Sequence, residues 1–179
     1  YDIWAKQRPP QGLQLSEDDY TSLAFSLALR DSSNAMILQQ QLARIKDPDR
    51  KRRFMLIMPA VSSDPATRDR FFEGLSQKAN RTDESAVVTA LSYLHHPLRQ
   101  VTSVHYLQKS LGLLTEIQRT GDIFFPDSWL TATFSRYQSR EAMSIVNDFL
   151  NSHPGYDPLL KAKILRATDN LRRCQALLQ

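Results

Sequence analysis

Apolar residues recur every three or four positions along most of this chain, and this spacing constrains the fold more than any other feature. Residues three and four apart share one face of a helix, so each apolar stripe predicts a helix that buries that face. Clear stripes contain Ala86, Val87, Ala90, Leu91 and Leu94, and later Leu160, Ile164, Ala167, Leu171, Cys174 and Leu178. No segment shows the alternation of apolar and polar residues that is typical of a half-buried strand. The sequence therefore predicts an all-α protein.

Helix starts can be placed by their capping residues. An aspartate before a proline can cap free amide groups, and proline suits the first helical position, whose N–H needs no partner. Such pairs occur at Asp47-Pro48, Asp64-Pro65 and Asp157-Pro158. Further helices are predicted to begin after Ser16, Thr82 and Ser139, where acidic residues follow and face the positive end of the helix dipole. Gly121 is placed to end a long helix.

These signals predict helices over residues 17–30, 33–45, 48–58, 65–77, 83–95, 103–120, 127–135, 140–152 and 158–177. The connections are short, so consecutive helices should pack as antiparallel neighbours. Successive pairs of this length are typical of an α-solenoid, and we predict a HEAT- or armadillo-like right-handed superhelix that forms a single helical domain over residues 1–179. No repeated sequence motif accompanies the pairs, and a compact helical bundle is the alternative.

Composition excludes several other classes of protein. With 41% hydrophobic and 23% charged residues and only 5 glycines, the chain is ordinary for a folded domain. Its longest dense apolar run, residues 54–58, is far shorter than the roughly 20 residues of a membrane span. The net charge of +4 is small, and the basic cluster at residues 50–53 follows two aspartates, so a solvated helix face is a better interpretation than a nucleic-acid site. The single cysteine, Cys174, excludes an intrachain disulfide and falls on an apolar stripe.

Adjacent histidines at positions 95 and 96 raise the question of a metal site. Zinc ligands on a helix are three or four residues apart, as in HExxH, whereas successive side chains diverge by about 100°. His96 also precedes Pro97, which disfavours a helical conformation there. His105 and His153 stand alone. We expect His95 and His96 to mark a helix end, with one ring packed and the other in solvent, and no zinc bound by this chain.

Other catalytic motifs are also missing from the sequence. It contains no GxxxxGK or GxGxxG loop for phosphate and no GxSxG turn for a nucleophilic serine. The carboxylate pairs Asp18-Asp19 and Asp83-Glu84 sit at predicted helix starts, where the helix dipole explains them. We therefore expect no catalytic site within this chain.

Longer phrases of the sequence resemble a known family. The segments are LSEDDYTSLAFSLALR (15–30), ARIKDPDRKRRFMLIMPAVSSD (43–64), ALSYLHHPLRQ (90–100), LQKSLGLLTEIQRTGDIFFPDSWL (107–130) and LKAKILRA (160–167). They resemble the C-terminal region of bacterial zinc aminopeptidases, most of all the aminopeptidase N-type enzymes of Bacteroides and its relatives. The resemblance covers nearly the whole chain through phrases rather than one short motif.

This resemblance implies a role without chemistry of its own. The family holds zinc in a thermolysin-like domain through HExxH and a downstream glutamate, and recognises the peptide amino terminus through a GxMEN loop in that domain. Neither pattern occurs here, so no catalytic or metal residue carries over. The family's last domain is a HEAT-like superhelix that closes over the catalytic domain and restricts peptide access. By this resemblance the chain's partners are the catalytic domain of the same polypeptide and its peptide substrates, and zinc belongs to the parent enzyme only.

The chain begins at Tyr1 without an initiator methionine, and we expect it to be a fragment truncated on its N-terminal side. In that case Trp4 and the stripe from Tyr20 to Leu27 should be exposed where missing helices normally cover them. Possible peptide contacts are Arg99, Gln100 and Tyr106, which surround the predicted helix break. The alternative for these residues is structural: Arg99 caps the preceding helix and Tyr106 packs.

Two other functions stay open from the sequence. A free-standing helical-repeat scaffold would bind a protein partner through the same kind of surface. A nucleic-acid-binding helical protein is supported only by the pI of 9.3 and the basic cluster at residues 50–53. The sequence allows a bacterial cytoplasmic location and a periplasmic or cell-envelope one equally.

Overall fold

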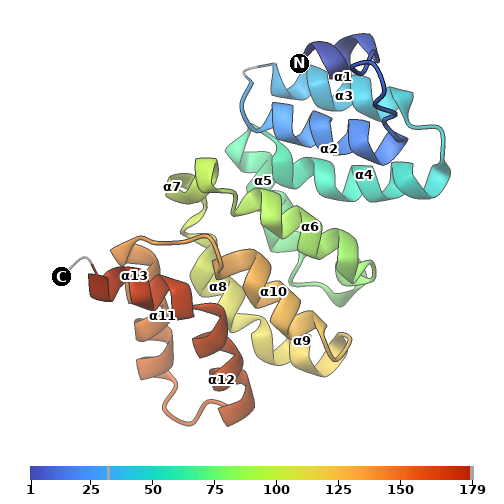
Figure 1. Ribbon diagram of the computed structural model, residues 1–179. Coiled ribbons are helices and arrows are strands. Elements are labelled where there is room, and N and C mark those ends of the chain that lie inside the picture. Colours follow the sequence, from blue (N-terminus) through green and yellow to red (C-terminus); the bar gives the residue numbers. More distant parts are fainter. Residues whose placement is uncertain (32, 178–179) are drawn as a thin grey trace. The chain divides into compact units, whose positions relative to one another are not determined.

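Every regular element of the computed structural model is helical, as the apolar spacing predicts (Figure 1). The structure describes residues 1–31 and 33–177, and within them no strand occurs. No helix in this part of the chain reaches the length and hydrophobicity that crossing a bilayer requires. The chain divides into two compact units, Tyr1–Glu73 and Gly74–Gln179. In a helical repeat protein each repeat packs mainly on its neighbours, so compact units occur within one continuous solenoid as well as in separate domains. The single domain and the solenoid therefore both stay predictions.

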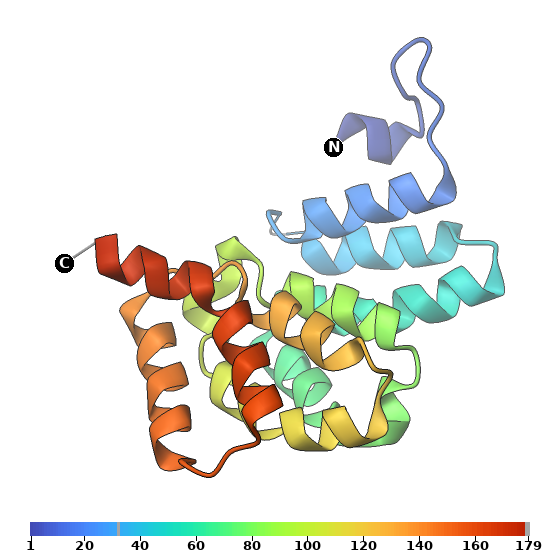
Figure 2. The ribbon, with the colours of Figure 1, turned by 60° about the horizontal axis from the view of Figure 1, so that its bottom comes forward.

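The first unit is built around a pair of helices and a third that covers them. Its helices are α1 (Asp2–Lys6), α2 (Glu17–Ala28), α3 (Asn34–Arg44), α4 (Pro48–Val61) and α5 (Pro65–Gly74), the last of which ends at the boundary. Figures 1 and 2 show α2, α3 and α4 side by side, with successive helices running in opposite directions. Phe25 of α2 stacks on Phe54 of α4 with ring centroids 4.6 Å apart.

The prediction that Trp4 is exposed is wrong. The short helix α1 places the indole in the interior, where it is 1% exposed and its N–H donates to Oε1 of Gln41 at 2.8 Å. The Arg44 guanidinium lies 4.7 Å from the centre of the indole ring, in a cation–π contact. Tyr20 and Leu27 are half-buried. A large aromatic ring with a polar N–H is thus covered from within this unit, with its hydrogen bond satisfied.

The second unit is arranged in two layers of helices. Its elements are η1 (Lys78–Arg81), α6 (Glu84–Leu94), η2 (Pro97–Arg99), α7 (Gln100–Ser103), α8 (Tyr106–Gly112), α9 (Leu114–Thr120), α10 (Phe125–Phe134), α11 (Arg140–Ser152), α12 (Pro158–Ala167) and α13 (Asp169–Leu177). The first layer contains α6, α10 and α12, with α10 in the middle, and the second contains α8, α11 and α13 (Figure 2). Helices of the same layer are therefore separated in sequence by an element of the other layer.

Most predicted helix starts are confirmed by hydrogen bonds. Ser16 forms a capping box with Asp19, and Asp47, Asp157 and Ser139 each accept a bond from a backbone amide of the following turn. The predicted start at Thr82 is wrong by one residue, because Asp83 is the cap and accepts from the Ala86 amide at 2.9 Å. Local chemistry within one turn is enough to place these starts.

Two long predicted helices are interrupted. The helix predicted at 103–120 is divided into α7, α8 and α9, with one break directly after Gly112, a residue of low helix propensity. The helix predicted at 158–177 is interrupted at Thr168, whose buried hydroxyl donates to the carbonyl of Ile164 at 2.8 Å. A threonine that bonds back to the preceding turn in this way bends a helix.

Gly121 ends α9 at the predicted place but for a different reason. Its backbone is extended, with φ −96° and ψ 176°, so no left-handed conformation requires glycine here. Instead, a Cβ atom at this position would lie 2.7 Å from Cδ1 of Phe125 and 3.0 Å from both Oε1 of Glu84 and the carbonyl oxygen of Ile117. Glycine is required because α6, α9 and α10 come together at this point.

Replacing this glycine should therefore destabilise the fold. We expect Gly121→Ala to lower the free energy of unfolding by about 1–3 kcal/mol, as is typical of overpacking. Gly112→Ala is the matched control, since a Cβ there meets nothing within 4 Å and the helix end should gain about 0.5 kcal/mol. Urea unfolding of both variants measures the difference, and equal stabilities would contradict the role of close approach.

Candidate functional site

One of the two adjacent histidines is packed, as predicted, whereas the other is half-buried rather than in solvent. His95 follows the last residue of α6 and is 1% exposed, with its Nδ1 atom 2.9 Å from the hydroxyl of Tyr137. His96 is half-buried and begins the short helix η2, where its Nδ1 atom accepts from the Leu98 amide. Within residues 1–31 and 33–177, no group of three or more His, Cys, Asp or Glu side chains is placed to hold a metal ion. The pair forms the end of a helix.

The surroundings of His95 are aromatic and dry. The rings of Tyr106 and Tyr137 lie edge-on to it, with centroids at 6.2 Å and 5.7 Å. Burial, together with the nearby His105, lowers the pKa of His95 from 6.5 to about 3, so the ring is neutral. Burial also raises the pKa of Tyr137, so its hydroxyl stays protonated. The Nε2 atom of His95 is buried without a hydrogen-bond partner, which makes this position a cost to folding.

The structure shows where the three predicted peptide contacts lie. Tyr106 is 3% exposed, with its ring against His95 and His105 in the interior of the second unit. Arg99 is 9% exposed. Gln100 is half-buried and its side-chain amide donates to the carbonyl of Arg136, which follows α10. The three residues are not brought together on one open surface, and their contact with peptides stays a prediction.

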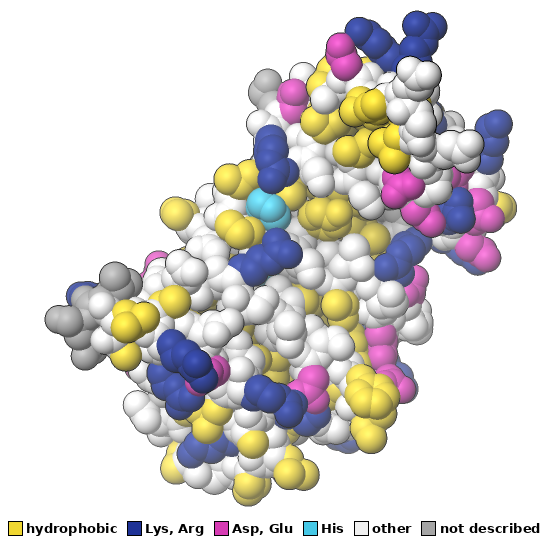
Figure 3. Space-filling model, in the orientation of Figure 1, with side chains coloured by type: hydrophobic (Ala, Val, Ile, Leu, Met, Phe, Trp, Pro, Cys, Tyr) yellow, Lys and Arg dark blue, Asp and Glu magenta, His cyan; other side chains and the backbone are white. Residues whose placement is uncertain are grey.

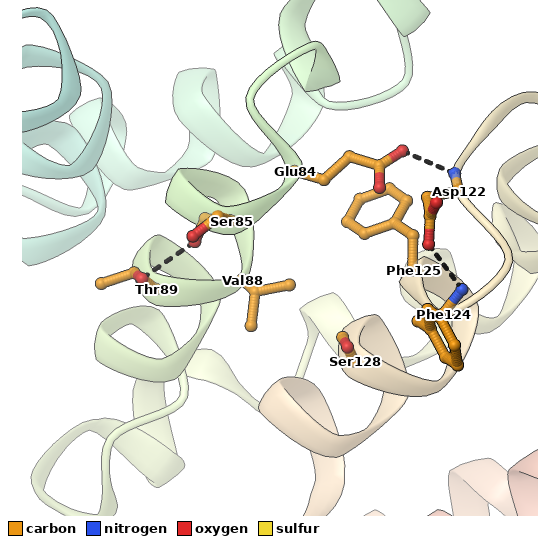
Figure 4. Close-up of a pocket in the computed structure, with 8 residues that line it drawn as sticks. All are labelled: Glu84, Ser85, Val88, Thr89, Asp122, Phe124, Phe125 and Ser128. Atoms are coloured by element: carbon orange, nitrogen blue, oxygen red, sulfur yellow. Dashed lines mark hydrogen bonds between the residues drawn. The ribbon is translucent and has the colours of Figure 1, made fainter. Parts of the chain in front are cut away.

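A groove on the exposed face of the first layer was not predicted from the sequence. One pocket of about 340 Å³ lies between α6 and α10 (Figure 4), lined by Glu84, Ser85, Val88, Thr89, Asp122, Phe124, Phe125 and Ser128. A second, of about 390 Å³, is lined by Val88, Ser92, Asp127, Ser128, Thr131, Ala132, Ser135 and Arg136. Both are lined by Val88 and Ser128, so the two pockets adjoin, and together they are called the α6–α10 groove below. Small hydroxyl residues three or four apart, such as Ser85, Thr89 and Ser92, are the sequence signal that marks its wall.

The two helices that form the groove run in the same direction. Glu84 at the start of α6 lies beside Asp122 and Phe125 at the start of α10, as Figure 4 shows. At the other end, Ser92 of α6 lines the same pocket as Arg136, which follows α10. Parallel neighbours place both helix N-termini, with their partial positive charge, at one end of the groove.

Carboxylates occupy that end of the groove. The backbone amide of Asp122 donates to Oε1 of Glu84 at 2.9 Å, and the amide of Phe124 donates to Oδ1 of Asp122 at 2.9 Å. Each carboxylate thus retains a second oxygen with unused acceptor capacity. The Phe124 ring lies on the Asp122 side and is 73% exposed, whereas the ring next to Glu84 is that of the buried Phe125 (Figure 4). An exposed aromatic ring near a carboxylate is a favourable environment for a cation.

A third carboxylate beside the groove is already neutralised. Asp127 of α10 receives charge-assisted hydrogen bonds from Lys163 and Arg166 of α12. Burial tends to raise the pKa of Asp127, but these two cations outweigh it and hold the pKa below its usual value. Asp127 therefore fastens α10 to α12.

Charge elsewhere on the surface is mixed. On the face shown in Figure 3, Lys and Arg side chains are scattered among Asp and Glu side chains. Arg50 in the basic cluster of α4 lies 3.5 Å from carboxylate oxygens of both Glu17 and Asp18. This distribution adds no support to a nucleic-acid site at residues 50–53.

No family model, curated protein or solved structure matches this chain. The resemblance to aminopeptidases therefore depends on the sequence phrases quoted above. The fold agrees with it only in being all-helical.

The environment of His95 predicts a pH-dependent stability. Below pH 6.5 the unfolded chain protonates this histidine, whereas the folded protein keeps it neutral until about pH 3. The unfolded state then binds more protons, so stability is lost as the pH falls through this range, by up to about 1.4 kcal/mol per pH unit. Urea unfolding at pH 7 and pH 5 should show a smaller loss for His95→Gln than for the wild type.

The neighbouring histidine provides the control for this measurement. His96→Asn keeps an acceptor for the Leu98 amide and leaves His95 in place, so it should lose stability with pH as the wild type does. An identical loss in the wild type and in His95→Gln would show that His95 is not the group responsible.

Proposed function

We propose that this chain is the non-catalytic helical domain of a zinc aminopeptidase, in which it covers the catalytic domain and shapes the access of peptides to the active site. The observation that carries this proposal is the resemblance of five long phrases, spread from residue 15 to residue 167, to the C-terminal region of these enzymes. The all-helical fold supports it, since that region of the family is helical throughout.

The layered arrangement of the second unit also supports the proposal. In a HEAT- or armadillo-like superhelix, corresponding helices of successive repeats stack in the same layer. Here α6, α10 and α12 lie in one layer and α8, α11 and α13 in the other. The finer fold that we propose is therefore this kind of superhelix, with the α6–α10 groove on the exposed face of one layer.

The alternative function is a free-standing scaffold that binds a protein partner. The α6–α10 groove favours it as much as it favours the first proposal, because either function requires an open polar surface that can bind a polypeptide. The two differ in whether the same polypeptide also contains a zinc peptidase domain.

Peptidase activity and zinc content distinguish these functions. We expect the chain alone to release no amino acid from aminoacyl amides or peptides and to contain no stoichiometric zinc. The full-length protein should do both, through an HExxH segment outside this chain. Activity or tight zinc binding in the chain alone would contradict the proposal. An inactive, zinc-free full-length protein would favour the scaffold.

The predicted peptide contacts can be tested in the full-length enzyme. We expect Arg99→Ala to raise KM roughly fivefold for long peptides and to leave the hydrolysis of single aminoacyl amides unchanged, because only long peptides would reach this domain. Since Arg99 is largely buried, thermal unfolding of the variant must first show that it folds. Unchanged kinetics on long peptides in a folded variant would remove Arg99 from the contacts.

A further inference from the structure

The α6–α10 groove has unneutralised charge of opposite sign at its two ends. Neither Glu84 nor Asp122 forms an ion pair within the described residues, and the same is true of Arg136 at the opposite end. Asp127, midway along the wall, is paired with two cations of α12. The groove thus has two carboxylates without an ion pair at one end, beside an adjoining pocket lined by Lys78 and by Arg81, which is paired with Glu116, and a guanidinium without an ion pair at the other end.

The section between the two ends is lined mainly by small side chains. Val88 and Ala132 supply small apolar surface, and Ser128 and Thr131 supply hydroxyl groups. No long charged side chain from α6 lines this section. Small hydroxyl side chains can donate to and accept from the amide groups of an extended backbone, and they leave room for it.

The length of the groove sets the size of its occupant. From Glu84 to Ser92 a helix rises by about 12 Å at ~1.5 Å per residue. An extended polypeptide covers this distance in roughly four residues at ~3.3–3.6 Å each. Ser92 lines the same pocket as Arg136, so a cationic group near Glu84 and an anionic group that meets the Arg136 side chain beside Ser92 would be about four residues apart.

We propose that the α6–α10 groove binds an extended polypeptide segment with a lysine or arginine at the end near Glu84 and Asp122 and a carboxylate about four residues away, near Arg136. The aliphatic part of the basic side chain would lie against the exposed ring of Phe124. This inference deepens the proposed function and rests on it, because it specifies which substrate peptides the domain recognises.

Titration of the full 179-residue chain with short capped peptides tests this inference. The probe is acetyl-Lys-Ser-Ala-Ser-Glu-amide, whose only charges are the two side chains. Its neutral counterpart carries glutamine at both charged positions. We expect backbone amide shifts in ¹⁵N NMR at residues 84–92 and 122–136, and roughly tenfold weaker binding of the neutral peptide. Added salt should weaken the charged peptide more.

Variants of the groove identify its two ends. The double variant Glu84→Gln, Asp122→Asn keeps the oxygen atoms that accept the amides of Asp122 and Phe124, and it should weaken binding of the charged probe roughly tenfold. Arg136→Gln should weaken it roughly threefold. Asp148→Asn on α11, in the other layer, removes a carboxylate away from the groove and should leave binding unchanged.

Several outcomes would overturn the inference. Equal binding of the charged and neutral peptides, undiminished binding by the double variant, or no binding at millimolar peptide would each do so. If lysine amide binds as tightly as the whole peptide, the groove binds only a cation and not an extended peptide. If the groove does not bind the charged probe but the full-length protein cleaves peptides, the proposed function is supported and only the inference about this groove is wrong. If the groove binds its probe and the full-length protein is no peptidase, the scaffold function is favoured.

Discussion

The packing of α10 on α6 is the contact on which the second unit depends. α10 also contacts α8, α9 and α12, so it joins the two layers. Its residues Trp129, Leu130 and Phe134 are at most 1% exposed, and burial of such large side chains stabilises the unit by about 2–3 kcal/mol each before the entropic cost of ordering them. In the turn before α10, a Cβ at position 121 would meet the Phe125 ring, the Glu84 carboxylate of α6 and the Ile117 carbonyl at 3.0 Å or less. A larger residue there would force these groups to shift at the point where α6, α9 and α10 meet.

The charge of the groove follows from the same contact. Because α6 and α10 are parallel, their N-termini meet, and carboxylates at that end satisfy amide groups and oppose the helix dipoles. Carboxylates at this place are therefore explained by helix stability alone. What stability does not explain is that Glu84 and Asp122 lack a cation partner beside an exposed aromatic ring, whereas Asp127, one turn further along, has two. The proposed binding depends on that difference.

Local features of the fold were predictable, and those that depend on distant contacts were not. Capping by Asp47 or Ser139 involves one turn of chain, so the residue types alone indicate it. The burial of Trp4 depends on contacts with Gln41 and Arg44, which no pattern near residue 4 indicates. The packing of one of the two histidines was predictable from the helix end that they occupy, but the choice of His95 depends on partners such as Tyr137, 42 residues away. For the groove, the hydroxyl residues of each wall could be seen in the sequence, but the pairing of α6 with α10 could not.

The region selected from the sequence and the groove found in the structure are connected through one residue. Of the three predicted contacts, Tyr106 and Arg99 are buried, and a buried side chain reaches a peptide only if the structure rearranges. Gln100 holds the backbone carbonyl of Arg136 and so fixes the segment that carries the basic end of the groove. If this region has a role in peptide recognition, the simpler explanation is that Gln100 positions Arg136, and not that Arg99 or Tyr106 contacts the peptide directly. The helix break at His95 and His96 then matters because it brings Gln100 to the end of α10.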